Sequence, residues 1–242
     1  MLRALLWDVD GTVAETERDG HRIAFNTAFE ALELPWRWSV PRYGELLHVT
    51  GGRERLLHDM KAQRDAPASS AARDSLAREL HRRKNLAYAV LLAQGGITPR
   101  PGVQRLVNEC RAAGVALAVV TSTGRSNVEA LFASIWGAAW MEMFATVVCA
   151  EDAPVKKPDP QAYLLALQCL GLTAHESFAL EDSPNGLQAE RAAGIPCGVT
   201  RSIYFQQARS EGAAWVRDDL DSPVPMTLPL LQAALAGSIG NF

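Results

Sequence analysis

The 242-residue sequence predicts an α/β fold in which a parallel sheet carries helices on both faces and an α-helical cap is inserted near the start. Beyond residue 96, short apolar runs alternate with helical patterns, which is typical of a parallel sheet covered on both sides. Residues 15–95 show helical periodicity and no convincing strand pattern. We therefore expect a Rossmann-like core from residues 1–14 and 96–220, a cap from 15–95, and a C-terminal tail from 221–242.

Composition and charge are those of an ordinary globular protein. The net charge is -3, with 21% charged and 48% hydrophobic residues, so no general attraction to nucleic acid is indicated. The four cysteines, Cys110, Cys149, Cys169 and Cys197, form no CxxC pair, which argues against a zinc site or a disulfide scaffold. No apolar run reaches membrane length, and no signal-peptide pattern is present. We expect a cytoplasmic monomer that binds neither nucleic acid nor a membrane.

The first strand and the cap helices follow from local patterns. Residues 4–9 are an apolar run and predict a buried strand. Phe25, Ala28 and Phe29 recur at helical spacing and predict the first cap helix, which Pro35 ends. Further cap helices are expected at residues 41–47, 53–61 and 69–92, with a loop at 63–70.

Strands and helices alternate after the rigid connector at residues 99–102. The expected strands cover residues 115–120, 146–150, 178–180 and 197–200, with a further candidate at 214–216. The expected helices cover residues 103–113, 126–132, 159–170 and 186–193. Ligands of such sheets bind at the C-terminal ends of the strands, so the cap should cover that edge. One helix fits residues 228–236 of the tail, which gives no functional indication.

Two carboxylates end the first strand in the motif Asp8-x-Asp10-Gly11-Thr12. Residues two apart in a strand face the same way, so both carboxylates can share one pocket. One can attack as a nucleophile while the other gives and takes a proton. Gly11 permits a sharp turn, and Thr12 with the N–H groups of that turn can hold an anion. Two carboxylates beside a phosphate require a cation such as Mg²⁺, although a bare DxD is more often an acidic turn.

Three hydroxyl residues follow the expected strand at 115–120. The Thr121 hydroxyl and the neighbouring N–H groups can bind phosphate oxygens at the strand end, and Ser122 and Thr123 can reach a substrate. The alternative is ordinary turn chemistry, because serine and threonine are common in turns after strands. The position after a parallel-type strand favours the phosphate-binding interpretation.

Basic and acidic residues complete the set of candidates. Lys157 precedes Pro158 at an expected helix start, where its charge can neutralise a nucleophile and a phosphoryl group. Lys156 is the alternative for this role. Two adjacent lysines are also common on a solvated helix face, which would give neither of them a catalytic role. Glu181 and Asp182 follow another apolar strand. Adjacent carboxylates repel one another unless a cation or solvent separates them, so they are either a surface turn or the missing metal ligands.

These four motifs, in this order, resemble those of the haloacid dehalogenase-like phosphohydrolases over residues 1–220. The resemblance implies that Asp8 is the nucleophile that forms an aspartyl-phosphate and that Asp10 is the general acid and base. It implies that Thr121 and Lys157 hold the phosphoryl group. The implied Mg²⁺ ligands are Asp8, Asp10 through its carbonyl oxygen, and Asp182, with Glu181 as a ligand or a support for one.

Seven cap residues are candidates for substrate contact: Glu17, His21, Thr50, Gly51, Gly52, Arg53 and Lys84. The glycines let the backbone approach a ligand, and the Arg53 guanidinium suits a phosphate, although a helix-start turn with a surface arginine is equally compatible. Lys84 lies in a basic stretch whose alternative is a solvated helix face. Glu17 and His21 are one helical turn apart, and a lone helical histidine is more often structural.

Together with Arg100-Pro101-Gly102, these cap residues resemble the CbbY subgroup, whose members are phosphatases of sugar bisphosphates such as xylulose 1,5-bisphosphate. Arg53 departs from the Gly-Gly-Lys usual in that subgroup. We expect a Mg²⁺-dependent sugar-phosphate phosphatase that acts on a ketose bisphosphate, with Arg53 and Lys84 on the second phosphate. The alternatives are a β-phosphoglucomutase-type phosphotransferase, a phosphoglycolate phosphatase, and a non-enzymatic phospho-receiver domain, which has no need of Asp10 or of the cap.

Overall fold

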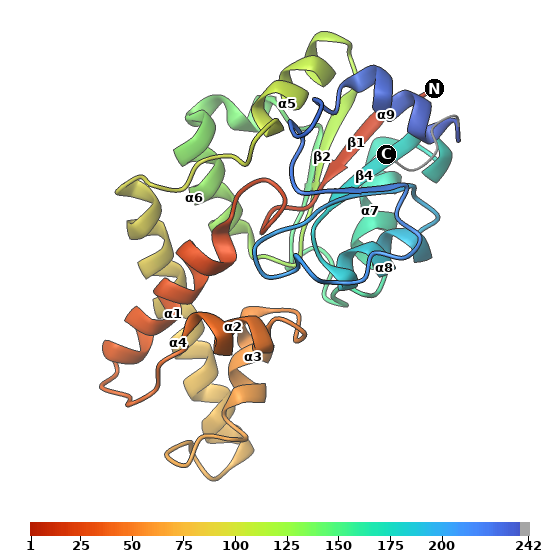
Figure 1. Cartoon of the computed structure of the whole chain (residues 1–242). Helices are drawn as coiled ribbons and strands as arrows, with labels where there is room; N and C mark the ends of the chain where they lie inside the picture. The colour runs from red at the N-terminus through yellow and green to blue at the C-terminus, as the bar shows by residue number, and fades with distance from the viewer. Residues whose placement is uncertain (238–242) are drawn as a thin grey trace.

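A parallel sheet forms the centre of the molecule, and the structure, a computed structural model, describes residues 1–237 of the chain. Within these residues the sheet has six strands in the order β3-β2-β1-β4-β5-β6 (Figure 1). The strands are β1 (Ala4–Trp7), β2 (Ala116–Val120), β3 (Thr146–Val148), β4 (Ser177–Glu181), β5 (Cys197–Thr200) and β6 (Trp215–Arg217). Leu5 of β1 aligns with Leu117 of β2 and Phe178 of β4. The predicted α/β fold with a parallel sheet is confirmed.

Helices cover both faces of the sheet because successive residues of each strand point to opposite sides. Leu5 and Trp7 belong to the cluster packed by α5, α6 and α9, whereas Ala4 and Leu6 belong to the cluster packed by α7 and α8. These helices are α5 (Val103–Ala112), α6 (Arg125–Trp136), α7 (Gln161–Leu170), α8 (Pro184–Ala192) and α9 (Leu228–Leu235). All four of these strand residues are fully buried.

A helical insertion separates β1 from the rest of the sheet and lies beyond the C-terminal end of β1 (Figure 1). Its elements are the π-helical turn η1 (Glu17–His21) and the helices α1 (Arg22–Glu30), α2 (Val40–Leu46), α3 (Gly52–Asp59) and α4 (Ser70–Ala93). The insertion has its own aromatic cluster, in which the Phe25 and Trp38 rings lie 4.8 Å apart. Its two connecting segments meet in a bridge between Ala14 and Pro99.

Several element boundaries differ from the expected ones. β1 ends at Trp7, because the Val9 carbonyl accepts hydrogen bonds from Thr12 and Val13 in a tight turn. Glu181 is the last residue of β4, paired with Val199, and does not follow the strand as expected. Two short 3-10 helices, η2 (Ala138–Glu142) and η3 (Ala174–Glu176), have no counterpart in the sequence-based expectation.

The expected C-terminal tail belongs to the core as far as it is described. Met226, Leu228 and Leu231 are buried in the same cluster as β1. Arg105 of α5 donates to the Asp221 carboxylate at 2.8 Å, and the Leu228 N–H donates to Glu109. Residues 221–237 of the expected tail therefore pack against the core, and residues 238–242 lie outside the described residues.

Two further expectations concern membranes and cysteines. Within residues 1–237, no helix combines the length and the hydropathy that a membrane span requires. All four cysteines are free thiols, of which three are buried and Cys169 is exposed.

Candidate active site

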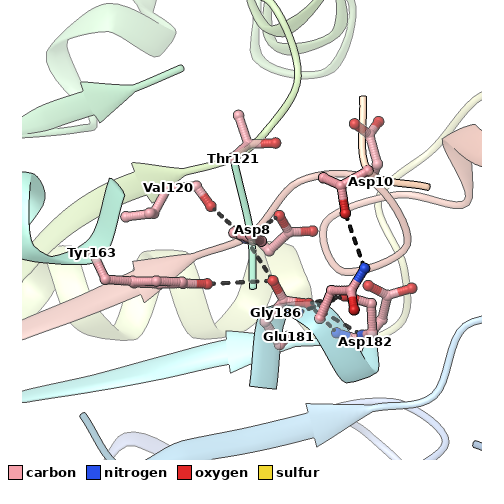
Figure 2. A network of polar contacts seen from close by, with 12 residues as sticks. Asp8, Asp10, Val120, Thr121, Tyr163, Glu181, Asp182 and Gly186 are labelled. Carbon is pink, nitrogen blue, oxygen red and sulfur yellow. Dashed lines mark hydrogen bonds and ion pairs between the residues drawn. The ribbon is translucent and has the colours of Figure 1, made fainter. Parts of the chain in front are cut away.

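A cavity of about 420 Å³ lies between the C-terminal ends of the strands and the helical insertion. Figure 2 shows the sheet side of this region, where Asp8, Thr121 and Glu181 come together at the ends of three neighbouring strands. Parallel strands place their C-terminal ends at one edge, so residues that are more than 100 positions apart become neighbours here. The cavity is lined by fourteen of the sixteen residues that the sequence analysis selected; Thr12 and Arg53 are the exceptions.

Lys157 connects the ends of β1 and β4. Its Nζ donates to Asp8 Oδ1 at 2.7 Å, to Glu181 Oε1 at 2.6 Å and to the Val120 carbonyl at 2.9 Å. Burial would lower the pKa of Lys157, but the charges of Asp8 and Glu181 outweigh it and raise that pKa. The ammonium group is therefore a permanent charge that holds Asp8 in one orientation. Lys156, the alternative, pairs instead with Glu54 of α3 at 2.8 Å.

Asp8, Glu181 and Asp182 form a buried cluster in which one carboxylate oxygen from each residue lies within 4.8 Å of the other two. Burial, reinforced by the charge of Glu181, raises the pKa of both Asp8 and Asp182 well above the usual value. Three carboxylates face one lysine, so the cluster carries more negative charge than its neighbours neutralise. A hard divalent cation with oxygen ligands is the group that would balance it. The donor set therefore fits Mg²⁺.

Glu181 has little capacity left for a cation. Its Oε1 accepts from Lys157 and from the Tyr163 hydroxyl at 3.3 Å, and its Oε2 accepts from the Asp182 N–H and from the N–H and hydroxyl of Ser183. Gly186 lies directly against this carboxyl, since a Cβ there would come within 1.8 Å of it. Glu181 is thus built to orient Lys157 and the Asp182 backbone, which leaves Asp8 and Asp182 as the free carboxylates.

The Asp10 carboxylate lies apart from this cluster and contacts the helical insertion. Its Oδ1 lies 2.9 Å from His21 Nε2 and accepts from the Thr16 hydroxyl at 2.5 Å, while its Oδ2 accepts from the Thr123 hydroxyl. Burial would raise the pKa of Asp10, but the charge and hydrogen bond of His21, together with both hydroxyls, lower it. His21 and Thr123, which were expected to contact substrate, therefore also position Asp10.

The loop after β2 lines the cavity at the strand ends, and the turn after β1 lies next to Asp182. Thr121 is buried, its Oγ1 accepts from the Thr123 N–H at 3.1 Å, and Ser122 lines the cavity beside it. Gly11 has φ +93°, and a Cβ there would come within 2.1 Å of Asp182, so only glycine fits. Thr12, an expected substrate contact, is buried and does not line the cavity.

On the insertion side, Arg53 does not line the cavity, whereas the neighbouring Arg55 does. Arg53 points away from the cavity and pairs with Asp74 of α4. Arg55 is buried, lines the cavity, and donates to the Tyr43 hydroxyl at 2.7 Å. The Tyr43 hydroxyl in turn donates to Glu17 at 2.5 Å.

Lys84 is the second buried cation of the insertion, with 3% of its surface exposed. Its Nζ makes one long hydrogen bond, 3.4 Å to Asn85, and lies 5.0 Å from the centre of the Tyr88 ring. Burial lowers the pKa of Lys84 to about 8, although Asp10 and Glu17 act in the opposite direction. No ion pair among the described residues involves Lys84. A buried ammonium so weakly bonded can accept an anionic ligand.

The loop before α3 closes one side of the cavity. Thr50, Gly51 and Gly52 line it as expected, and the Thr50 hydroxyl accepts from Asn185 of α8 at 2.9 Å. His81 of α4 also lines the cavity, and burial, with the charge of Lys84, lowers its pKa to about 4. The histidine is therefore neutral at physiological pH.

The cavity-lining residues that the sequence analysis did not select include Tyr43, Arg55, His81, Asn127 and Phe205. Arg55 lies two residues after Arg53 in the same basic stretch, and only the packing of the helices shows which of the two lines the cavity. The other four carry no local signal, because none lies in a motif that ends a strand. Their selection requires the tertiary arrangement of α2, α4, α6 and the loop after β5.

Comparisons with known proteins show the family of the chain. The sequence model of the haloacid dehalogenase-like hydrolase family matches residues 2–194. The plasmid-encoded protein CbbY of Cupriavidus necator is 41% identical over 222 residues, which are 92% of this chain and 87% of that protein. CbbY of Cereibacter sphaeroides is 41% identical over 213 residues, which cover 88% of this chain and 90% of that protein.

Solved structures show the same relation. CbbY from Rhodobacter sphaeroides, in complex with phosphate, superposes with a TM-score of 0.84 at 39% identity and covers 90% of this chain and 95% of its own. A mutant of that protein was solved in complex with xylulose-(1,5)bisphosphate, with a TM-score of 0.85. β-Phosphoglucomutase from Clostridium difficile, at 18% identity and a TM-score of 0.75, shares the fold. This chain belongs to the haloacid dehalogenase-like hydrolase family, resembles its CbbY members, and is a phosphatase.

Proposed function

We propose that this phosphatase hydrolyses a ketose bisphosphate of the xylulose 1,5-bisphosphate type, in a Mg²⁺-dependent reaction through an aspartyl-phosphate on Asp8. The observation that carries the substrate class is the pair of buried cations, Arg55 and Lys84, on the cavity wall opposite Asp8. Support also comes from the relative that was solved with a sugar bisphosphate.

Asp8 is the nucleophile in this proposal. Lys157 occupies Asp8 Oδ1, which leaves Oδ2 to form a bond to phosphorus as the bond to the leaving sugar oxygen breaks. The leaving oxygen takes a proton from Asp10, and Asp10 then takes a proton from the water that attacks the aspartyl-phosphate, so the proton balance closes over the cycle. The low pKa of Asp10 is a property of the ligand-free site, and the negative charge of a bound phosphate raises it.

The phosphoryl group needs positive charge and hydrogen-bond donors at the strand ends. Lys157 supplies a charge fixed by three hydrogen bonds, and Thr121 lies at the end of β2 with Ser122 beside it. Asp8, Asp182 and the Asp10 carbonyl would hold Mg²⁺. The bound metal would neutralise negative charge on the carboxylates and on the phosphoryl oxygens. Most of the catalysis then comes from position and charge, as in other phosphoryl transfers.

The second phosphate explains why the insertion buries cations. Arg55 is partly neutralised by Glu17 at 3.6 Å, but Lys84 has no acidic partner among residues 1–237. A monophosphate that occupies the catalytic end would leave Lys84 buried without a counter-charge, which is unfavourable. A phosphate at the far end of the substrate would supply that counter-charge. His81, neutral and next to Lys84, is available to a sugar hydroxyl.

Phosphate release from a substrate panel, with Lys84→Met as the test variant, decides this proposal. Xylulose 1,5-bisphosphate should be preferred over xylulose 5-phosphate, phosphoglycolate and β-glucose 1-phosphate. Lys84→Met should lower kcat/KM for the bisphosphate by about 10- to 100-fold, because one charge-assisted contact is lost, and should spare the monophosphates. Arg82→Met is the matched control, since Arg82 lies on the same helix, is 58% exposed and pairs with Glu79.

Two outcomes would contradict the proposal. Equal losses for bisphosphates and monophosphates in Lys84→Met would remove the distal phosphate site. Isomerised sugar phosphate without net phosphate release would assign the chain to the phosphotransferases.

A further inference from the structure

The loop that follows β5 belongs to the core, yet two of its residues lie in the aromatic cluster of the helical insertion. We infer that Tyr204 is a positioning residue: its ring fixes α2 of the insertion against the core and thereby sets the substrate-binding wall of the cavity. Phe205, the next residue, completes that wall. The inference rests on the phosphatase activity of the chain and does not require a particular sugar.

Tyr204 packs so closely against α2 that position 44 of that helix has no room for a side chain. Its ring centre lies 6.0 Å from that of Tyr43. A Cβ on Gly44 would come within 2.8 Å of Tyr204 Cδ1, so glycine is required at this position for the ring to reach the helix backbone. Gly44 does not have a positive φ, so its role is to leave space for the ring and not to permit a turn.

The loop is anchored in the core immediately before Tyr204. Arg100 donates through Nη2 to the Arg201 carbonyl at 2.6 Å, and the Ile203 N–H donates to Glu15 at 3.2 Å. Ser202 is buried beside Asp182 and offsets part of the rise in the pKa of that carboxyl. The Tyr204 ring is therefore attached to the same backbone that surrounds the acidic cluster.

The contact continues from Tyr204 into the cavity through Tyr43. The Tyr43 hydroxyl accepts from Arg55 and donates to Glu17, and the Arg55 guanidinium lies 4.9 Å from the centre of the Tyr43 ring. Movement of the Tyr43 ring would therefore displace both charged groups. Tyr204 thus influences the positions of Arg55 and Glu17 indirectly, through its contact with the Tyr43 ring.

The Tyr204 hydroxyl contributes nothing to this arrangement. It is buried, and it has no hydrogen-bond partner among residues 1–237. The ring alone makes the contact, so Tyr204→Phe should preserve it. Gly44→Ala should break it, even though alanine is the better helix former, because the new Cβ collides with the ring.

The test is a double-mutant cycle with two substrates. Tyr204→Ala and Gly44→Ala should each raise KM for xylulose 1,5-bisphosphate by about tenfold, the effect of losing one packed aromatic contact. Turnover of p-nitrophenyl phosphate, which needs only the strand-end residues, should change by less than about threefold. The double variant should be no worse than either single variant, because the Gly44→Ala methyl group fills the space that the ring leaves. Tyr204→Phe and Gln206→Ala, an exposed neighbour, should behave as wild type.

Hydrogen exchange of the α2 amides provides a readout that needs no substrate. Exchange should accelerate about tenfold in Tyr204→Ala and stay unchanged in Tyr204→Phe. Additive effects in the cycle, equal losses on both substrates, or unchanged α2 exchange would each overturn the inference. Wild-type protein that cleaves p-nitrophenyl phosphate but no sugar bisphosphate would instead refute the proposed substrate, and the exchange data would still decide the role of Tyr204.

Discussion

Glu190 of α8 is a fully buried acid that the proposed reaction does not use, and it makes a sharp prediction about stability. Its exposed fraction is 0%, and neither carboxyl oxygen has a hydrogen-bond partner in the described part of the chain. Burial, and then the negative charge of Glu181, raise the pKa of Glu190 well above its usual value. The side chain therefore stays protonated in the folded protein at a pH where the unfolded chain has released the proton.

The sign of the effect follows from this difference. The folded state binds one more proton than the unfolded state once the pH exceeds the ordinary glutamate pKa of 4.5. The contribution of Glu190 to the free energy of unfolding therefore falls as pH rises from there toward the folded-state pKa. The loss amounts to about 1.4 kcal/mol for each pH unit inside that window.

Glu190→Gln removes the ionisation and keeps the shape of the side chain. We expect the variant and the wild type to have free energies of unfolding within about 1 kcal/mol of each other near pH 4.5, and the variant to become the more stable of the two as the pH rises above 4.5. Urea unfolding at several pH values measures the difference, in which the other titrating groups cancel. Glu142→Gln, at an exposed position, is the matched control for loss of a carboxyl group. A difference between Glu190→Gln and wild type that does not change with pH would refute the reasoning.

Four further predictions concern the catalytic end of the cavity. Asp8→Asn should abolish phosphate release in a steady-state assay, and retained activity would exclude Asp8 as the nucleophile. Lys157→Met should lower the free energy of unfolding by about 3–5 kcal/mol, because it leaves buried carboxylates unpaired, and chemical denaturation would show this. Gly186→Ala should reduce activity by displacing the Glu181 carboxyl, and a crystal structure with Glu181 unmoved would contradict this. Treatment with EDTA should remove activity and added Mg²⁺ should restore it, whereas activity that survives chelation would refute the metal requirement.

The catalytic end of the site could be predicted because its residues follow strands. Asp8, Thr121 and Glu181 end three neighbouring strands, and the C-terminal ends of parallel strands meet at one edge. Local sequence therefore determined both the chemistry and its location. Lys157 does not follow a strand; it was selected from its place before Pro158, although α7 begins only at Gln161.

The substrate end depends on packing between helices, which local sequence does not encode. Arg53 and Arg55 both lie within about 100° of Leu56 around α3, so helical phase alone does not distinguish them. Asp74 of α4 pairs with Arg53, and Tyr43 of α2 receives Arg55. The contacts of α3 with α2 and α4 therefore determine which arginine lines the cavity.

The packing of residues 221–237 against the core also could not be predicted from local sequence. Residues 221–237 contain prolines and few charges, and their burial depends on Arg105 and Glu109 of α5, more than 100 positions away.

The sequence by itself determined the parallel sheet, the helical insertion and the reactive groups at the strand ends, because periodicity and strand-end position are local properties. The tertiary structure alone decided that Arg55 and not Arg53 lines the cavity, that His21 contacts Asp10, and that Tyr204 of the core packs against Tyr43 of the insertion. Each of these contacts joins segments that are distant in sequence, and only the packed arrangement of the helices brings them within a few ångströms.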